Sequence, residues 1–420
     1  MHSGVIPISK NCDILIAGGS FTGLMLAIAV ANTFRSELKI LVTGFDEDAM
    51  LDRQNPRAFA LSAASRNMLE ALGLWASIEA SAQPVRSIEL TDSPLTAGIR
   101  PKALCYSNVL DDGSPASFIV PAYILGQALI DNCMSLEASG TLVLATTRVA
   151  KVSSDEGQLI SFLESDAIVR SRLVVAAEGR TGNLRTAAGL DTVRFDHRQL
   201  GIVTIVKHEK PHHETAIQHF LPAGPFAVLP LKGQQSCITW SEDKAVAEHI
   251  MQLDDREFLQ ELDQRFAGRF GAIELVGSRR SFPLATEVAR RFVAERFALV
   301  GDSAHAVHPI AGQGLNLAFR DIAALTECMA NGSSVGLDIA DPITLETYES
   351  WRRFDSVLAA GVFAGINMLF ANDRSLLRSV REMGLSAVQQ LDGLKGTFVR
   401  HAAGQAGELP KFLRGERIII

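Results

Sequence analysis

The clearest pattern near the start of the chain is a short apolar run, a glycine-rich break, a long apolar run and a second short apolar run. Residues 13–17 and 39–43 have the length and composition of buried strands, and residues 23–32 have those of an apolar helix. A strand, a helix and a strand in this order predict a βαβ unit, which implies a parallel sheet. Residues 14–34 carry no charge and are long enough to span a membrane, but the break at residues 18–20 favours strand, turn and helix.

A different pattern occupies the middle of the chain. Residues 201–206 and 236–240 alternate or are rich in β-branched side chains, and residues 220–230 between them are broken by glycine and proline. Closely spaced strands separated by such residues are typical of an antiparallel sheet. We therefore predict a second domain of antiparallel strands.

On either side of this region the pattern returns to strands alternating with helices. Residues 172–177 and 297–300 are candidates for buried strands, residues 57–75 favour a helix from about Ser62, and a helical pattern runs from about residue 344 to near 390. These elements predict an α/β fold, with a Rossmann-like domain interrupted by the antiparallel sheet and followed by C-terminal helices. The predicted division is residues 1–85, 105–190 and 280–345 for the Rossmann-like domain, 86–104 and 191–279 for the sheet domain, and 346–420 for the helical segment.

Composition narrows the class of protein. The chain has 420 residues, of which 47% are hydrophobic and 21% charged, so extensive disorder is excluded. Lys and Arg number 40 against 47 Asp and Glu, and this net charge of −7 argues against a nucleic-acid binder. The five cysteines have no CxxC spacing, which favours buried thiols in a reducing, cytoplasmic compartment. No metal site is predicted, because the histidines at 208, 212, 213 and 219 are expected in a solvated loop between strands.

The glycine turn at residues 18–23 (GGSFTG) is close to the dinucleotide fingerprint GxGxxG. That fingerprint provides a tight turn and a helix N-terminus whose N–H groups face a pyrophosphate. Two features depart from it: Ser20 stands at the second glycine, and residues 42–44 end the next strand without the acid that holds an adenosine ribose, the nearest acid being Asp46. The candidate phosphate-binding residues are Gly18, Ser20, Thr22 and Gly23.

A longer and more specific motif lies at residues 300–316 (VGDSAHAVHPIAGQGLN). A strand ends at Gly301-Asp302, where a carboxylate can accept hydrogen bonds from ligand hydroxyls, and a Gly-rich loop then opens a helix whose dipole suits negative charge. This run resembles the second flavin-binding motif of the single-component FAD-dependent aromatic hydroxylases. The resemblance implies that Asp302 binds the ribityl chain of FAD and that the loop lies along the flavin ring. The residues so implicated are Gly301, Asp302, Pro309, Gly312, Gly314, Leu315 and Asn316.

The middle motif of the same family is matched at residues 174–185. The family has a strand that ends in Asp-Gly, and here Glu178 stands in place of the Asp, followed by Gly179 and Arg180. The resemblance implies that these three residues serve the binding of FAD and NAD(P)H. Together with Ser20 and the missing ribose acid, Glu178 is a third departure at the dinucleotide end, whereas the redox end is intact.

Within the family, the chain resembles the ubiquinone-biosynthesis hydroxylases nearly from end to end. Residues 57–65 with 72–75 match the pattern RxxALSxxS and LGLW of that subfamily, and residues 220–231 are similar to its strand over the flavin. The resemblance implies that Arg57 lies close to the flavin and that Gln127 is a polar FAD ligand on a helix. Further matches are at residues 311–317, 320–321 and 348–353.

What the resemblance implies is ring hydroxylation of a polyprenylated phenol on the way to ubiquinone. NAD(P)H would reduce FAD, O₂ would add at the flavin C4a, and the hydroperoxide would deliver the hydroxyl group, a chemistry that belongs largely to the cofactor. The site is expected between the antiparallel sheet and the flavin, with Pro230, Pro309, Gly312 and Gly314 on its flavin-side wall. Other ubiquinone-biosynthesis proteins and peripheral contact with the inner membrane are the further partners considered.

The three departures keep a second hypothesis open. A relative that binds FAD poorly could serve as a non-catalytic scaffold in the biosynthetic assembly, and such a protein would tolerate changes at the dinucleotide end. The intact loop at residues 301–316 argues against this alternative, because a scaffold has little physical need for it.

Overall fold

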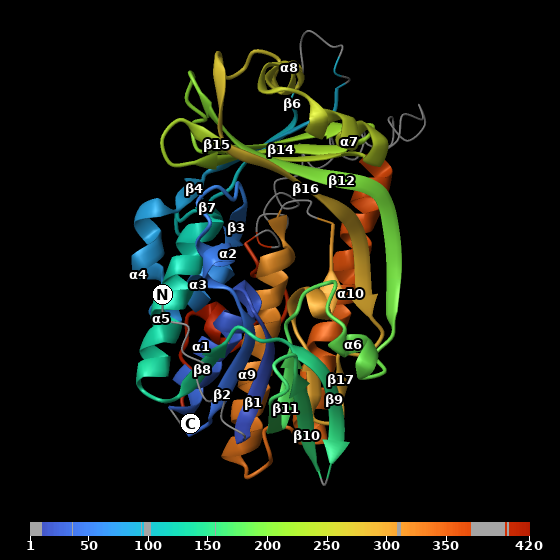
Figure 1. Cartoon of the computed structure of the whole chain (residues 1–420). Helices are drawn as coiled ribbons and strands as arrows, with labels where there is room; N and C mark the ends of the chain where they lie inside the picture. The colour runs from blue at the N-terminus through green and yellow to red at the C-terminus, as the bar shows by residue number, and fades with distance from the viewer. Residues whose placement is uncertain are drawn as a thin grey trace.

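The protein is built from a lower α/β part and an upper antiparallel sheet (Figure 1), as seen in a computed structural model that describes residues 11–35, 37–93, 95, 102–155, 157–308, 312–370, 400 and 403–420. Two long strands, β12 (Thr192–His208) and β16 (Ile273–Ala289), run from one part to the other beside helix α10 (Pro342–Phe370). They pair with each other along most of their length. The second region is therefore inserted into the first, as the sequence predicted.

The lower part contains the predicted parallel sheet. Strand β1 (Asn11–Gly19) lies between β2 (Ile40–Phe45) and β11 (Ile168–Ala176) and is parallel to both. The order is β17-β18-β11-β1-β2-β8, with an antiparallel extension through β10 and β9. Its other strands are β8 (Leu142–Ala145), β9 (Val149–Asp155), β10 (Gln158–Leu163), β17 (Val293–Ala294) and β18 (Phe297–Leu299).

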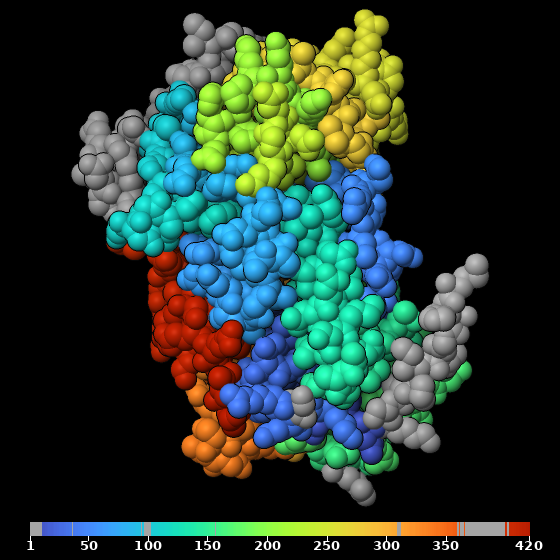
Figure 2. Space-filling model, turned by 90° about the vertical axis from the view of Figure 1, so that its left-hand side faces the viewer, coloured from blue at the N-terminus to red at the C-terminus, as the bar shows by residue number. Residues whose placement is uncertain are grey.

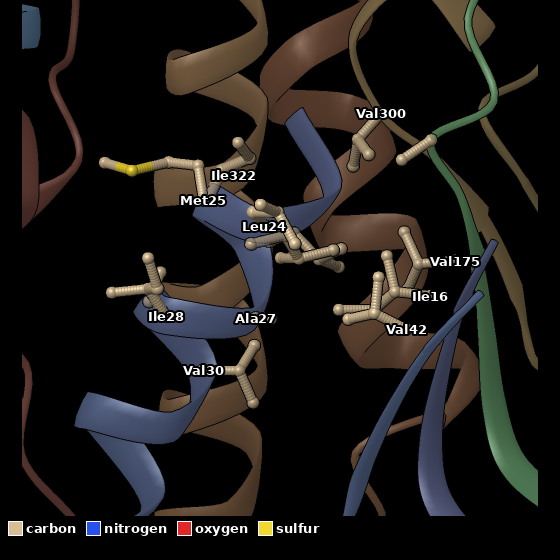
Figure 3. Close-up of a cluster of buried hydrophobic side chains, with 14 of the residues drawn as sticks. Ile16, Leu24, Met25, Ala27, Ile28, Val30, Val42, Val175, Val300 and Ile322 are labelled. Atoms are coloured by element: carbon tan, nitrogen blue, oxygen red, sulfur yellow. The ribbon is translucent and has the colours of Figure 1, made fainter. Parts of the chain in front are cut away.

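Helix α1 (Phe21–Phe34) explains the long uncharged run near the start of the chain. It packs between the sheet and the helices α5 (Ala122–Ala138) and α9 (Gly314–Ser334), and Leu24 and Ile28 are fully buried there (Figure 3). Burial on several sides removes the need for a polar face. Among the described residues, no helix is long and apolar enough to cross a membrane.

The upper part is an eight-stranded sheet in the order β19-β16-β12-β15-β14-β13-β5-β6, and its pairs are antiparallel except for β13 with β5. Two helices that the sequence analysis did not predict, α7 (Lys244–Gln252) and α8 (Asp255–Phe266), cover the face turned away from the α/β part (Figure 1). The remaining strands are β5 (Ser87–Thr91), β6 (Lys102–Ser107), β13 (Thr215–Leu221), β14 (Gly224–Leu231), β15 (Gln235–Asp243) and β19 (His305–Ala306).

A small third sheet joins the two parts. Strand β7 (Ser117–Pro121) pairs with both β3 (Ala58–Ser62) and β4 (Gln83–Val85). Ser62 then caps α3 (Ala63–Ala71), since its hydroxyl accepts a hydrogen bond from the Ser65 N–H at 3.1 Å. The predicted helix from about Ser62 is thus confirmed. Short helices α2 (Glu47–Leu51), α4 (Trp75–Ile78) and α6 (Leu184–Ala187) complete the connections.

Residues 403–420 are folded against the α/β part. Ile418 is 5% exposed and belongs to the main hydrophobic core. Asn67 and Arg417 donate hydrogen bonds that tie α3 to residues near the end of the chain. Figure 2 shows this segment, in red, lying against the lighter blue residues of α3 and α4. A 3-10 turn, Lys411–Arg414, ends the described elements.

The structure corrects the expectation of a solvated histidine loop. His208 and His219 lie in strands β12 and β13 and are each 3% exposed. His208 pairs with the Ser236 hydroxyl at 3.0 Å, and His219 pairs with the Thr91 hydroxyl at 2.5 Å. All five cysteines are free, as predicted, and four of them are buried. Burial raises the pKa to about 12 for Cys12, Cys133, Cys237 and Cys328.

Candidate functional site

The glycine turn between β1 and α1 is closely packed. A Cβ on Gly18 would lie 2.3 Å from the Ala177 carbonyl oxygen, and one on Gly23 would lie 1.7 Å from the Gly18 oxygen. Neither position can carry a side chain, which is what the dinucleotide fingerprint requires of them. Ser20, in contrast, has an extended backbone and an exposed side chain that makes no capping hydrogen bond. The first N–H groups of α1 are therefore left for an anion, and no acidic residue lies in the first turn.

The acid that directly follows β2 is Asp46, and it is used in capping the next helix. The Asp46 carboxylate accepts a hydrogen bond from the Ala49 N–H at 3.0 Å and caps α2. Gly44, with a φ of +70°, donates its N–H to the Thr147 carbonyl oxygen at 2.8 Å. The departure that the sequence indicated at this strand is thus real in the folded protein.

The middle and second motifs meet at the carboxyl edge of the parallel sheet. The Gly179 N–H donates to the Ser303 hydroxyl at 3.1 Å, and that hydroxyl donates to the Gly179 oxygen at 3.3 Å. Glu178 accepts a hydrogen bond from the Leu184 N–H at 3.2 Å, while burial raises the pKa of its carboxyl. Arg180 is directed elsewhere, toward the Pro283 carbonyl oxygen at 2.9 Å. Of the three middle-motif residues, Glu178 and Gly179 therefore lie beside the second motif.

The loop that carries Asp302 is held from behind by a buried carboxylate. The Gly301 N–H donates to Asp321 Oδ2 at 2.9 Å, and His305 lies 2.6 Å from the same oxygen. Arg352 donates to Asp321 Oδ1 at 2.9 Å. Burial alone would raise the pKa of Asp321, but the charges of His305 and Arg352 lower it. Residue 321 was noted above only as a match to the subfamily, and its role in fixing the loop was not predicted.

Asp302 itself is exposed on that loop, next to the start of α9. A Cβ on Gly314 would lie 3.9 Å from its Oδ1. Thr22 packs against the same loop, because a Cβ on Gly301 would lie 3.0 Å from its methyl group. The carboxylate of Asp302 makes no hydrogen bond within the part of the chain that the structure describes, so it remains available to a ligand.

Arg57 lies across from Asp302 and is electrostatically coupled to it. Its guanidinium stands 4.7 Å from the centre of the Phe59 ring and is accessible to solvent. Surrounding protein lowers the pKa of Arg57, and the charge of Asp302 opposes that effect. The two charged groups are therefore close enough to interact, and both side chains are exposed.

Both the oxygen and the nitrogen of the Asn316 side-chain amide make hydrogen bonds within the protein. Its Oδ1 accepts from the Ser62 N–H at 2.9 Å and the Ser65 hydroxyl at 2.7 Å, and its Nδ2 donates to the Ala60 oxygen at 2.8 Å. The contact of Asn316 with a flavin edge stays a prediction, and its side-chain amide is already used within the fold. A Cβ on Gly312, whose φ is +63°, would lie 3.0 Å from the Cβ of Ala60, so this loop sits directly on β3.

Four remaining predicted residues have mixed outcomes. Gln127 lies exposed on α5 and donates to Asp131 at 2.8 Å, and Leu315 packs against the main core. Pro309 lies outside the described residues. Pro230 lies on β14, where side chains point alternately to the two faces of the sheet. It is therefore on the same face as Phe226 and Val228, which pack against α7 and α8. The prediction that Pro230 lines the flavin side is thus corrected: Leu229 and Leu231 are the β14 residues that face β3.

Sequence reasoning missed two polar residues, His197 and Gln199, that contact His308 beside the flavin loop. His308 is fully buried and its ring contacts that of His197 at 4.9 Å. Gln199 donates to the Ala223 oxygen at 2.5 Å, so its own oxygen faces His308 Nε2 at 3.3 Å and accepts the hydrogen there. Burial and the charge of His197 lower the pKa of His308 to about 3. Alternation could not have indicated this group, because the register of β12 shifts between Asp196 and Gln199 and Arg198 has a φ of +55°.

Comparison with known proteins decides the family. The chain matches the FAD binding domain family over residues 11–356. It is 35% identical to ubiquinone hydroxylase UbiL of Rhodospirillum rubrum, over 97% of this chain and 93% of that protein. The chain belongs to the ubiquinone hydroxylases of this FAD-binding family. It is also 28% identical to the 3-demethoxyubiquinol 3-hydroxylase of Escherichia coli, over 94% of this chain and 99% of that enzyme. This ubiquinone hydroxylase homologue is an FAD-dependent monooxygenase, as predicted.

Solved structures confirm the predicted aromatic hydroxylase-like fold. The p-nitrophenol 4-monooxygenase PnpA of Pseudomonas putida superimposes with a TM-score of 0.77 at 17% identity, covering 96% of this chain and all of that one. HpxO of Klebsiella pneumoniae, solved with FAD and uric acid, superimposes with a TM-score of 0.71 at 16% identity, covering 94% and 96%. At these identities the likeness establishes the arrangement of the elements.

The residues of this ubiquinone hydroxylase homologue fit FAD. The uncapped N-terminus of α1 suits the pyrophosphate. The unbonded Asp302 carboxylate suits the hydroxyls of the ribityl chain, and the N-terminus of α9 points its dipole at the same region. FAD is therefore the cofactor, and each end of the site offers a group of the right chemistry for it.

Proposed function

We propose that this protein hydroxylates the aromatic ring of a polyprenylated phenol in ubiquinone biosynthesis, with NAD(P)H as reductant and O₂ as cosubstrate. The observation that carries the proposal is the end-to-end similarity to ubiquinone hydroxylase UbiL. The complete second flavin motif, held in place by Asp321, supports a catalyst over a scaffold.

When bound, FAD supplies reduction by NAD(P)H and the activation of O₂. The chain's own residues position it. Asp302 accepts hydrogen bonds from the ribityl hydroxyls, and the turn at Gly18 and Gly23 lets the backbone approach the pyrophosphate. Gly312 and Gly314 bring main-chain N–H groups of the α9 N-terminus toward the edge of the ring that gains negative charge. Arg57 adds a positive charge on the same side.

The apolar face of the upper sheet excludes water from the site. The buried side chains of Val203, Leu231 and Cys237 pack there with Val85 and Ile119 of the third sheet. A site closed by such side chains strengthens electrostatic contacts and protects a reactive oxygen donor from water. A neutral His308 adds hydrogen-bonding capacity at this boundary without introducing charge.

Membrane contact and association with other ubiquinone-biosynthesis proteins belong to the same proposal. Phe354, Val357 and Leu358 share one face of α10 and are 73%, 51% and 52% exposed. Their spacing of three and four residues forms a continuous apolar stripe. Such a stripe suits a lipid surface, where a polyprenylated substrate resides, or a partner protein.

The test is product formation with isotopic oxygen. The purified protein is incubated with FAD, NADPH or NADH, a short-chain prenylphenol and ¹⁸O₂, and the product is analysed by mass spectrometry. We expect one ¹⁸O atom in a hydroxylated ring and consumption of reduced nicotinamide that depends on the phenol. FAD binding without hydroxylation of any prenylphenol would contradict the substrate class, and absence of FAD binding would favour the scaffold hypothesis.

A further inference from the structure

The adenosine half of FAD lacks the acid that the dinucleotide fingerprint provides. Asp46 is occupied in capping α2, and Glu178 accepts a hydrogen bond from the Leu184 N–H. These two carboxylates are therefore engaged in local structure. Another group at this edge of the sheet must supply specific contacts to that half of the cofactor.

Arg148 occupies the place in question. It lies in the loop between β8 and β9, which the hydrogen bond from Gly44 to Thr147 holds against the end of β2. The point where a Cβ on Gly44 would lie is 3.4 Å from Arg148 Cγ and 4.0 Å from the Gly19 nitrogen. The aliphatic part of the Arg148 side chain thus packs over Gly44, where a larger residue would have its side chain, and lies beside the glycine turn.

The guanidinium of Arg148 is available for a ligand. The side chain is exposed, and it makes no ion pair or hydrogen bond within the part of the chain that the structure describes. Helix α1 begins at Phe21, directly after Gly19 and the N-cap residue Ser20, and its N-terminus has no side-chain cap. The charge of Arg148 also opposes the rise that burial causes in the pKa of Glu178, so the two side chains interact electrostatically. A cation and a helix N-terminus therefore lie at this edge of the sheet, and both favour a negatively charged group. An acid at the end of β2 would pair with Arg148 and cancel its charge.

We propose that Arg148 binds the adenosine diphosphate half of FAD, in place of the acid that holds the ribose in the usual fingerprint. The planar guanidinium can donate two parallel hydrogen bonds to phosphate oxygens, or lie flat against the adenine. This inference rests on the use of FAD in the proposed function. In this chain a positively charged side chain would bind the adenosine half of FAD, where the usual fingerprint has a negatively charged one.

The test compares flavins that do and do not contain adenosine. FAD and FMN are titrated into the full-length, deflavinated wild type and into Arg148→Ala and Arg148→Lys, and binding is followed by quenching of flavin fluorescence. We expect Arg148→Ala to raise the FAD dissociation constant by about 10- to 100-fold, the loss of a charge-assisted contact, and to leave FMN binding unchanged. Lys151→Ala is the matched control, because Lys151 is an exposed cation on the adjoining strand β9.

A second measurement uses ADP alone. We expect ADP to raise the melting temperature of the wild type and of Lys151→Ala, and to lose most of this effect in Arg148→Ala. FAD affinity within about twofold of the wild type in Arg148→Ala would overturn the inference, and so would equal weakening of FAD and FMN. A change confined to the KM for NADPH would also overturn it, because Arg148 would then serve the nicotinamide cofactor. Failure of the wild type to bind FAD would instead contradict the proposed function.

Discussion

The Gly301 N–H donates a 2.9 Å hydrogen bond to the carboxylate of Asp321, which lies 20 residues further along the chain and is fully buried. Through this contact the helix that follows the flavin loop also fixes the residue that precedes Asp302. His305 and Arg352 hold the carboxylate in its charged form. The position of the exposed Asp302 is thus set by the buried carboxylate of Asp321.

Replacing Asp321 should damage both stability and cofactor binding. Asp321→Asn removes the negative charge beside a buried Arg352, and loss of one partner of a buried ion pair costs about 3–5 kcal/mol. Urea unfolding of the purified variant measures this. Asp355→Asn is the control, because Asp355 pairs with the same arginine and is 29% exposed, so a smaller loss is expected. Equal stability of Asp321→Asn and the wild type would contradict the role of the carboxylate.

Removing the Asp302 carboxylate should weaken FAD binding directly. Asp302→Ala loses charge-assisted hydrogen bonds worth about 1.5–3 kcal/mol, so the FAD dissociation constant should rise by about 10- to 100-fold. Flavin fluorescence titration measures the change. Because Asp302 is exposed, unfolding by urea should be little affected, which separates this variant from Asp321→Asn. Unchanged FAD affinity would remove Asp302 from the site.

Replacing Ser20 by the glycine that the fingerprint has at this position should change the affinity for FAD little. Ser20 has a φ of −104° and an exposed side chain, so its backbone needs no glycine and its hydroxyl leaves the helix N-terminus open. We expect Ser20→Gly to bind FAD within about twofold of the wild type. A marked gain in affinity would show instead that the hydroxymethyl group crowds the pyrophosphate.

Acid should destabilise the protein through His308. Burial, with the charge of His197, lowers its pKa from 6.5 to about 3, so between these values the unfolded chain binds a proton that the folded one excludes. Its contribution to stability is complete above pH 6.5 and is lost as the pH falls toward 3. His308→Gln should reduce the slope of unfolding free energy against pH by up to about 1.4 kcal/mol per pH unit.

Urea unfolding at several pH values between 5 and 7 tests this expectation. His249→Gln is the matched control, since His249 is exposed near the end of α7. An identical pH slope for His308→Gln and the wild type would mean that other groups cause the acid sensitivity. His197 and His208 are such groups, because burial lowers the pKa of each from 6.5.

The sequence by itself determined the parts of this protein that depend on neighbours along the chain. Apolar periodicity predicted the βαβ unit, and the glycines at 18 and 23 could be assigned to a tight turn because close backbone packing excludes any side chain there. The long motif at residues 300–316 predicted the flavin loop and the helix after it, and comparison confirmed the family.

Only the tertiary structure decided where side chains from distant segments meet. The inward or outward direction of Pro230 follows from the register of β14 with β15, and the burial of His208 and His219 follows from helices that cover their sheet. Arg148 reaches the end of β2 from a loop about a hundred residues away. Such pairings depend on hydrogen-bond register and packing across the sheet, which leave no periodic signal in the local sequence.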